Sequence, residues 1–403
     1  MKFSKLRQLI LVSSIGLLVA TLLTACQIVT IDYVFVASSA GSGSGSNGQI
    51  QTYAADSATG ALRITAPTVS TGGVNPIALA VTSDYLNLYV ANQESNSVVH
   101  FAISLSGVLT QKDSVTTSFK PASIAVNAAG TYLFVVGGTS PSELAVYPLT
   151  AGAIGAVATS QQLSVPGFTG DLLVPTGVTV LTNNNVVYVT AYDQSAYNPG
   201  GTATSSANPG WVFGYTVGSG GQLTAALGSP FKAGIKPSAI VADPTNRYVY
   251  VTDYASNQLI GYGVQSGSTL DFLINGPFHT GNEPAAVVID PRGKFLYVAN
   301  SLDSTVSAYS IDLSTGTPSG VSNVTGSSSN ITDTQPVAIA ADPAVGRFIY
   351  TANHLGNTVS GFILDPTAGT MTTTQATPYP TGQGPTALIS IPNGNHSVQS
   401  ITP

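Results

Sequence analysis

The segment "FHTGNEP" at 278–284 places an imidazole and a carboxylate four residues apart in a stretch with no strand or helix pattern. His279 and Glu283 could form a general-base pair for attack of water on an ester or lactone, because such hydrolysis needs a group that accepts a proton from water. They could also be a surface histidine and an unrelated glutamate, since a spacing of four in a loop fixes no geometry. Both interpretations stay open.

Two lysines occupy equivalent places in the chain. Lys120 and Lys236 each directly precede a proline, Pro121 and Pro237, and the whole chain has 12 Lys and Arg residues. A pair of cations at equivalent positions is typical of an anion or carboxylate site at a rim. The alternative is two solvated lysines that protect loop ends.

The stretch "YDQSAYNPGGTATSSANPGW" at 192–211 is longer than a turn and carries Tyr192, Tyr197 and the one tryptophan, Trp211. Loops of this length inside a compact domain tend to be functional or disordered. Exposed aromatic rings among Asn, Ser and Thr suit stacking on carbohydrate or peptide. Alternatively, the stretch is an insertion and Trp211 begins the next strand.

Asp193 and His354 follow predicted strands and are further candidates for ligand contact. The Asn residues around such loops are also what turns require, because Asn tolerates left-handed backbone and bonds to its own main chain. Calcium needs several oxygens from one cluster, and no loop here is dense in Asp. With a single cysteine and no zinc motif, we expect neither a metal nor a cofactor.

The N-terminus reads as a targeting segment. A basic start is followed by "LILVSSIGLLVATLL" at 9–23, which is shorter than the roughly 20 residues of a spanning helix. "LTAC" at 23–26 resembles a bacterial lipobox. The resemblance implies that residues 1–25 are removed, that Cys26 is lipidated, and that residues 26–32 tether the domain to a membrane. Gln27 after the cysteine favours the outer membrane of the cell envelope.

Composition limits the possible partners. Apolar residues make up 43% of the 403 residues, enough for a large core, and charged residues 7%. Three of the 12 basic residues lie before residue 26, which leaves nine against 18 acidic ones. Nucleic acid requires clustered Lys and Arg, so we exclude it as a partner.

Seven prolines open matching segments, 45 to 62 residues apart: Pro76, Pro121, Pro175, Pro237, Pro284, Pro336 and Pro385. After each of the first six come an apolar run, a turn, a strand such as "LYVAN" at 88–92, an alternating strand and a weaker one. No helical period appears after the targeting segment. Four strands in such a period predict a propeller blade.

The ends of the chain predict how the ring closes. "YVFVASSA" at 33–40 is a second strand that lacks its first, and "GPTALISIP" at 384–392 is a first strand without a unit after it. Joined, they make one blade. The sequence therefore predicts an all-β, seven-bladed propeller of four-stranded blades over residues 33–403, closed by strands from both termini.

The repeats "LYVAN" and "DPRGKF" at 290–295 resemble those of the YVTN-repeat and lactonase-family seven-bladed propellers, typified by bacterial 6-phosphogluconolactonase. The resemblance covers residues 33–391. It implies that ligands bind at one mouth of the channel, where the loops before each first strand meet the loops between second and third strands. It also implies lactone hydrolysis, although the repeat itself carries no catalytic residue.

Two functions follow. The scarcity of His, Glu and Arg at the predicted mouth favours a lipid-anchored propeller that binds a small molecule, glycan or protein. The alternative is a lactone or ester hydrolase. Arg247, Arg292 and Arg347 fall in turns at the opposite mouth, and Arg is the natural partner of phosphate, which argues against a phosphorylated lactone.

Overall fold

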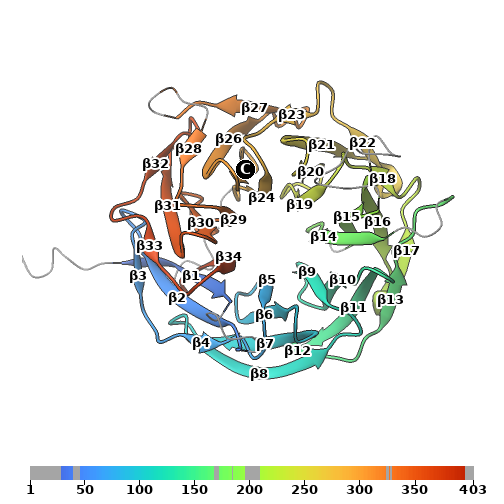
Figure 1. Ribbon diagram of the computed structural model, residues 1–403, viewed down its shortest axis with the longest axis horizontal. Helices are drawn as coiled ribbons and strands as arrows, with labels where there is room; N and C mark the ends of the chain where they lie inside the picture. The colour runs from blue at the N-terminus through green and yellow to red at the C-terminus, as the bar shows by residue number, and fades with distance from the viewer. Residues whose placement is uncertain are drawn as a thin grey trace, which may run out of the picture.

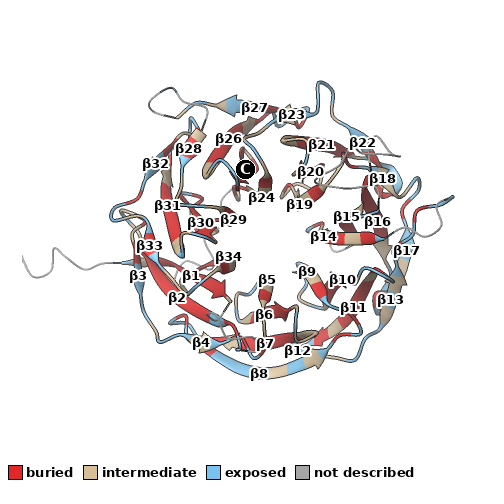
Figure 2. Cartoon of the chain, in the orientation of Figure 1, coloured by how far each residue is buried: buried red, intermediate tan, exposed pale blue. Residues whose placement is uncertain are grey.

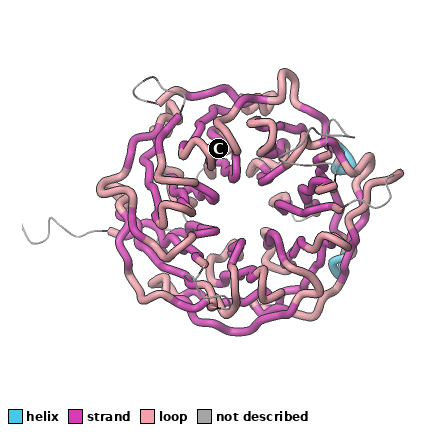
Figure 3. Tube along the Cα trace, viewed as in Figure 1, coloured by secondary structure: helices cyan, strands magenta, loops and turns pink. Residues whose placement is uncertain are grey.

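The computed structural model describes residues 29–39, 46–167, 172–183, 185–195, 209–323, 326 and 329–394. These residues form seven antiparallel sheets around a central axis (Figure 1), which confirms the predicted seven-bladed propeller. Cys26, Tyr197 and the stretch 396–402 lie outside the described residues. The described helices are two 3-10 turns, η1 (Ser219–Gly221) and η2 (Ser266–Ser268), neither long enough to cross a membrane (Figure 3).

The three inner strands of every blade pair in order. The first strands surround the channel: β5 (Pro76–Val81), β9 (Pro121–Val126), β14 (Leu173–Val180), β19 (Pro237–Ala242), β24 (Pro284–Ile289), β29 (Pro336–Ala341) and β34 (Pro385–Pro392). The second strands are β6 (Asn87–Asn92), β10 (Tyr132–Gly137), β15 (Val186–Asp193), β20 (Tyr248–Asp253), β25 (Phe295–Asn300), β30 (Phe348–Asn353) and β1 (Thr30–Ser38). The third strands are β7 (Ser97–Ile103), β11 (Glu143–Thr150), β16 (Gly210–Val217), β21 (Gln258–Val264), β26 (Thr305–Ile311), β31 (Thr358–Leu364) and β2 (Gln49–Asp56).

The outermost position is continuous in one blade, as β8 (Leu109–Thr116). In the other six it is split into two short strands that pair with the two ends of the third strand. The first pieces are β3 (Leu62–Ile64), β12 (Ala153–Ile154), β17 (Leu223–Ala225), β22 (Leu270–Phe272), β27 (Pro318–Val321) and β32 (Met371–Thr373). The second pieces are β4 (Val69–Ser70), β13 (Thr159–Gln162), β18 (Phe231–Lys232), β23 (Phe278–His279), β28 (Ser329–Ile331) and β33 (Tyr379–Pro380).

Blade 1 is built from both ends of the chain. β34 pairs antiparallel with β1, from Asp32 opposite Pro392 to Ser38 opposite Pro385. We number the others in chain order, so that blade 2 is β5–β8, blade 3 is β9–β13, and blades 4 to 7 follow in groups of five strands. The predicted closure is confirmed, and it removes the open edges that a linear array of sheets would expose.

The core consists of seven apolar layers, one between each pair of neighbouring blades. A strand points alternate side chains to opposite faces, and both faces of a blade are covered by its neighbours. In β6, for example, Leu88 and Val90 pack toward blade 1, while Tyr89 and Ala91 pack toward blade 3. Figure 2 shows this burial concentrated in the inner strands, with exposed residues along the outer edge.

A tyrosine in the second strand ties five of the blades to the blade that follows. In five blades its buried hydroxyl donates to a backbone carbonyl in an outer turn of the following blade, as from Tyr250 to Gly316 O at 2.6 Å. The other four are Tyr89 to Gly152 O, Tyr188 to Ser268 O, Tyr297 to Gly369 O and Tyr350 to Gly60 O. The tyrosine therefore supplies apolar area and, at five of the seven junctions, one polar contact.

A buried acidic pair lies where the ring closes. The side chains of Asp32 in β1 and Asp342 in blade 7 are fully buried. Asp342 accepts backbone N–H groups of its own turn, including that of Ala344 at 2.7 Å, whereas neither Asp32 oxygen has a partner among the described residues. Burial, reinforced by the neighbouring Asp342 carboxylate, raises the pKa of Asp32 well above its usual range.

We expect Tyr250→Phe to lower the free energy of unfolding by about 1–3 kcal/mol, because the buried carbonyl of Gly316 loses its donor. Urea denaturation of the purified chain measures the change. Tyr132→Phe is the control, since among the described residues the contacts of Tyr132 are backbone hydrogen bonds and a ring contact with Phe134, with none to its hydroxyl. Equal stability of Tyr250→Phe and the wild type would contradict the assigned role.

Asp32→Asn should flatten the dependence of melting temperature on pH. The folded-state pKa of Asp32 lies above its unfolded value, so the folded state binds the extra proton and the stability from Asp32 falls as pH rises above about 4. Melting curves from pH 4 to 8 should therefore show Asp32→Asn gaining relative to the wild type at the higher pH. Asp271→Asn, an exposed position in β22, is the control. Parallel curves for Asp32→Asn and wild type would show that Asp32 does not hold this proton.

Candidate functional site

One mouth of the channel is formed by two sets of equivalent residues. The residue before each first strand, here called the lead-in residue, accepts a backbone hydrogen bond from the residue that follows the second strand of the same blade. These N–H to O pairs are Gln93 to Asn75, Gly138 to Lys120, Tyr254 to Lys236, Ser301 to Glu283, His354 to Gln335 and Ser39 to Gly384. In blade 4 the longer β14 pairs Val174 with Tyr192 instead. The two loop classes that we expected at one mouth therefore do meet there.

Lead-in side chains reach back to the preceding blade. Glu283, before β24, accepts a hydrogen bond from the Tyr254 hydroxyl of blade 5 at 2.6 Å between oxygens. Lys236 Nζ lies 5.6 Å from the centre of the Tyr192 ring of blade 4 and 4.4 Å from that of Tyr254. Lys236, Glu283, Tyr254 and Tyr192 therefore form one cluster, which we call the mouth cluster, over blades 4 to 6.

The mouth cluster combines a cation, a carboxylate and two aromatic walls, all half-buried. Burial lowers the pKa of the Lys236 ammonium, and the nearby Glu283 carboxylate acts in the opposite direction. The two rings add cation–π attraction to the ammonium. In this arrangement the Glu283 carboxylate can accept a proton, and the Lys236 ammonium can stabilise a negative charge that forms beside it.

A buried aspartate fixes the backbone that carries Lys236. Asp253, fully buried at the end of β20, accepts the N–H of Lys236 at Oδ1 and that of Ile235 at Oδ2, each at 2.9 Å. Gln258 Nε2 donates to the same Oδ2 at 3.1 Å. These bonds hold the lysine at the mouth, so Asp253 is a positioning residue.

Both backbone polar groups of Glu283 are hydrogen-bonded. Its N–H donates to Asn257 Oδ1 at 2.8 Å, and its carbonyl accepts from the N–H and the hydroxyl of Ser301, each at 2.9 Å. Its φ of 54° lies in the left-handed region, as do the φ angles of the lead-in residues Asn75 and Gln335. This conformation thus recurs at the lead-in residues of blades 2, 6 and 7, and in blade 6 the residue that adopts it carries a carboxylate.

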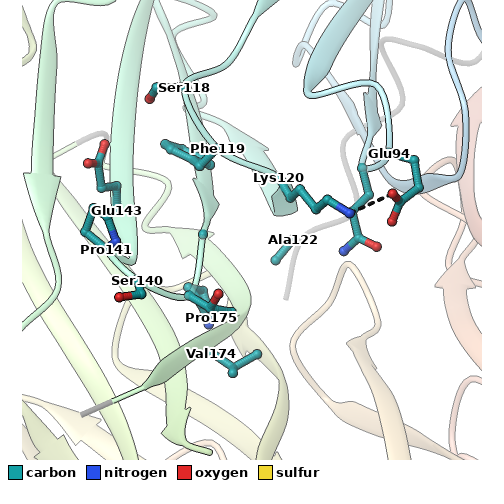
Figure 4. A pocket seen from close by; sticks show the side chains of 13 residues that line it. Glu94, Ser118, Phe119, Lys120, Ala122, Ser140, Pro141, Glu143, Val174 and Pro175 are labelled. Atoms are coloured by element: carbon teal, nitrogen blue, oxygen red, sulfur yellow. Dashed lines mark hydrogen bonds and ion pairs between the residues drawn. The ribbon is translucent and has the colours of Figure 1, made fainter. Parts of the chain in front are cut away.

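The second lysine lies in a separate part of the mouth. Lys120 Nζ pairs with Glu94 Oε2 of blade 2 at 2.6 Å, and both side chains are about half exposed (Figure 4). They border a cavity of about 450 Å³ between the loops of blades 2, 3 and 4. Lys120 and Lys236 are equivalent in the repeat, as the sequence indicated, but they serve different contacts.

The structure does not join His279 to Glu283. His279 lies exposed on β23, where its carbonyl accepts the Tyr309 hydroxyl at 2.6 Å, and no described hydrogen bond links its ring to Glu283. Glu283 pairs with Tyr254 instead. The reason is local: three intervening residues carry the chain from the outer edge of blade 5 to the channel.

Of the described residues in the stretch 192–211, Tyr192 lies at the mouth and Trp211 does not. Tyr192 belongs to the mouth cluster, but Trp211 lies in β16 with 8% of its surface exposed and Lys232 Nζ 3.8 Å from its ring centre. Of the two interpretations, the structure therefore shows the second: Trp211 lies at the start of a strand and packs in the layer between blades 3 and 4. The Asp193 carboxylate accepts the N–H and hydroxyl of Ser195, a turn contact.

The remaining candidates lie at the edges of the site. His354 follows β30, and its Nδ1 lies 3.1 Å from the carbonyl of Pro385 in blade 1. Within the described residues, no three His, Cys, Asp or Glu side chains come together to hold a metal ion. Arg247, Arg292 and Arg347 lie between first and second strands, at the opposite mouth, and bond to carbonyls of the next blade.

Sequence reasoning missed Tyr254. The signal was present in the repeat. In the second strands of blades 4, 5 and 7, one residue pairs with the repeat proline, and the next residue along the chain is Tyr192, Tyr254 or His354. Aligning the repeats at the proline-paired residue would have gathered all three at the mouth. Only the inter-blade packing shows that Tyr254 meets Glu283.

The chain belongs to the lactonase seven-bladed β-propeller family. The model of that family, "Lactonase, 7-bladed beta-propeller", matches residues 33–171 and 236–396. The unmatched part contains β14 to β18, which is the blade with the extended first strand and the aromatic loop. No curated protein matches the chain.

Solved structures share this architecture. The periplasmic gluconolactonase PpgL of Pseudomonas aeruginosa superposes with a TM-score of 0.73 at 20% identity, over 90% of this chain and 99% of that one. A Bacteroides fragilis protein provisionally assigned as a 6-phosphogluconolactonase gives 0.71 at 17%, over 91% and 99%. Hydrazine synthase of Kuenenia stuttgartiensis gives 0.55 at 15%, over 81% and 92%. At these identities the likeness shows the fold, which hosts different chemistries.

Glu283→Gln should lower the pKa of Lys236 further, because the carboxylate that favours the charged ammonium is lost while the burial remains. Titration of ¹³C-labelled lysine side chains by NMR measures the shift. Asp271→Asn is the control, since that carboxylate lies exposed on the outer edge. An unchanged Lys236 titration in Glu283→Gln would show that the two groups are not coupled.

Proposed function

We propose that this protein is a lactone hydrolase and that the mouth cluster is its active site. The hydrogen bond from Tyr254 to Glu283, with Lys236 beside both, carries the proposal. It orients a carboxylate next to a cation at the mouth of a lactonase-family propeller. Membership of that family and the likeness to a gluconolactonase support the choice of a lactone over other esters.

The chemistry follows from the two charges. Glu283 Oε2 is occupied by Tyr254, so Oε1 accepts a proton from water as the water oxygen attacks the lactone carbonyl carbon. The Lys236 ammonium stabilises the oxyanion that forms. When the ring C–O bond breaks, the proton held by Glu283 passes to the departing alkoxide oxygen. The product is the open hydroxy acid, and the carboxylate is regenerated.

The charges also limit the substrate. The mouth cluster supplies one lysine, and Arg247, Arg292 and Arg347 lie at the other mouth. Phosphate is bound best by several cations, Arg above all. The substrate we propose is therefore an unphosphorylated sugar lactone, with the Tyr192 ring as an apolar wall for the sugar.

We propose further that the domain is anchored in the cell envelope through Cys26. In β1, Asp32 pairs with Pro392 and Ser38 pairs with Pro385, so the N-terminal end of β1 points away from the mouth cluster. β1 begins at Thr30, so a tether of residues 26–29, shorter than the 26–32 expected from the sequence, would hold the opposite mouth against the membrane. The proposed active site would face away from the lipid, open to a diffusing sugar lactone.

The test is hydrolysis of glucono-δ-lactone by the purified full-length chain, followed by acid release. We expect Glu283→Gln to lower kcat about 10²- to 10⁴-fold, as for loss of a general base. Lys236→Met, which keeps the length of the side chain, should lower kcat about 10²- to 10³-fold. Asp271→Asn controls for loss of a carboxylate elsewhere on the domain.

A variant of His279 separates the alternatives. His279→Gln should retain wild-type kcat, since its ring lies on the outer edge. Loss of activity in His279→Gln with full activity in Glu283→Gln would overturn the assignment of the base. No turnover above buffer for a panel of sugar and aliphatic lactones would favour a propeller that binds a ligand without hydrolysis.

A further inference from the structure

We propose that the 450 Å³ cavity beside Lys120 is a subsite for a second, neutral sugar ring, so that the substrate is the lactone of a disaccharide acid. This inference rests on the proposed function for the lactone end of the substrate. It assigns a ligand class to a cavity that the hydrolytic mechanism does not use. The volume lies within the range of small-molecule sites, about 300–1,000 Å³.

The cavity exists because the first residue after β10 is a glycine, Gly138. Where other blades place Gln, Tyr, Ser or His, blade 3 has Gly138, whose φ of 75° lies in the left-handed region. A Cβ on the preceding Gly137 would come 2.1 Å from the carbonyl oxygen of Lys120. Larger residues are therefore excluded at both positions, and the space between Lys120 and Val174 of blade 4 stays open (Figure 4).

The far wall of the cavity is held in place. The hydroxyl of the buried Ser142, just after the Thr139–Pro141 loop, donates to the carbonyl of Leu173 at the start of β14. Val174 and Pro175 of the same strand line the cavity. They belong to the blade that the family model leaves unmatched, so this wall is a feature of this chain.

The lining suits a hydroxylated ring better than an ion. Glu94, Lys120 and Glu143 carry two negative charges against one positive charge, which disfavours phosphate or sulfate. Glu94 already pairs with Lys120, and Glu143 accepts the Ser160 hydroxyl at 2.6 Å. A carboxylate keeps free lone pairs and an ammonium keeps free N–H groups after one contact, so both can still hydrogen-bond to neutral hydroxyls. The carbon faces of Phe119, Pro141 and Pro175 supply the apolar side that a sugar ring also needs.

The cavity adjoins the proposed active site through one strand pair. Val174 lines the cavity and pairs directly with Tyr192 of the mouth cluster across β14 and β15. Residues paired in an antiparallel sheet lie about 5 Å apart at Cα. One ring placed at Tyr192 and a linked ring placed beyond Val174 would therefore occupy adjacent positions at one mouth.

Binding of cellobionate and gluconate to the full-length chain, measured by calorimetry, tests the subsite without requiring turnover. We expect cellobionate to bind about tenfold or more tightly than gluconate, and Thr139→Trp, which fills the cavity from an exposed loop position, to remove that difference. Lys120→Met should also weaken cellobionate and leave gluconate unchanged. Leu355→Trp is the matched control, because it adds the same ring at the equivalent exposed position in blade 7.

The outcomes separate the two proposals. Equal binding of the two acids, or a cellobionate affinity that neither Thr139→Trp nor Lys120→Met changes, would overturn the subsite, even with gluconolactone hydrolysed. Tight cellobionate binding that depends on Thr139 and Lys120, without hydrolysis of gluconolactone or cellobionolactone, would uphold the subsite and refute the lactonase. We expect hydrolysis of both lactones, with the higher kcat/KM for cellobionolactone falling to the gluconolactone value in Thr139→Trp.

Discussion

The pairing of β34 with β1 is the contact on which the rest of this structure depends. Each blade covers both faces of its sheet with its two neighbours, so an open array would leave two apolar faces in water. Closure converts seven sheets into seven buried layers and fixes the distance between lead-in residues around the channel. The mouth cluster exists because side chains from blades 4, 5 and 6, far apart in sequence, are held in this ring.

The fold could be predicted because its information is local and repeated. Proline-led strands, the alternation in β6 and the two incomplete ends each follow from residue type and period. The split of the outer strand was not visible, since pieces such as β22 and β23 are only three and two residues long. The sequence left Trp211 open between an exposed ring and the start of the next strand, because an apolar residue at the end of a long loop fits both, and the structure shows the strand.

The site was predicted in part. Position in the repeat identified Lys236 and Glu283 as lead-in residues, and the ring brings them together. Sequence spacing suggested His279 as the partner of Glu283, but partners at this mouth come from the preceding blade, which supplies Tyr254. Contacts between blades depend on side-chain direction at each junction, and the repeat period does not encode it.

A crystal structure of the full-length chain with glucono-δ-lactam, a lactone analogue that resists hydrolysis, would test the central claim most directly. The account predicts the lactam carbonyl within hydrogen-bonding distance of Lys236 Nζ, with its carbon facing Glu283 Oε1. Binding at the opposite mouth, beside the arginines at positions 247, 292 and 347, would contradict the proposed active site.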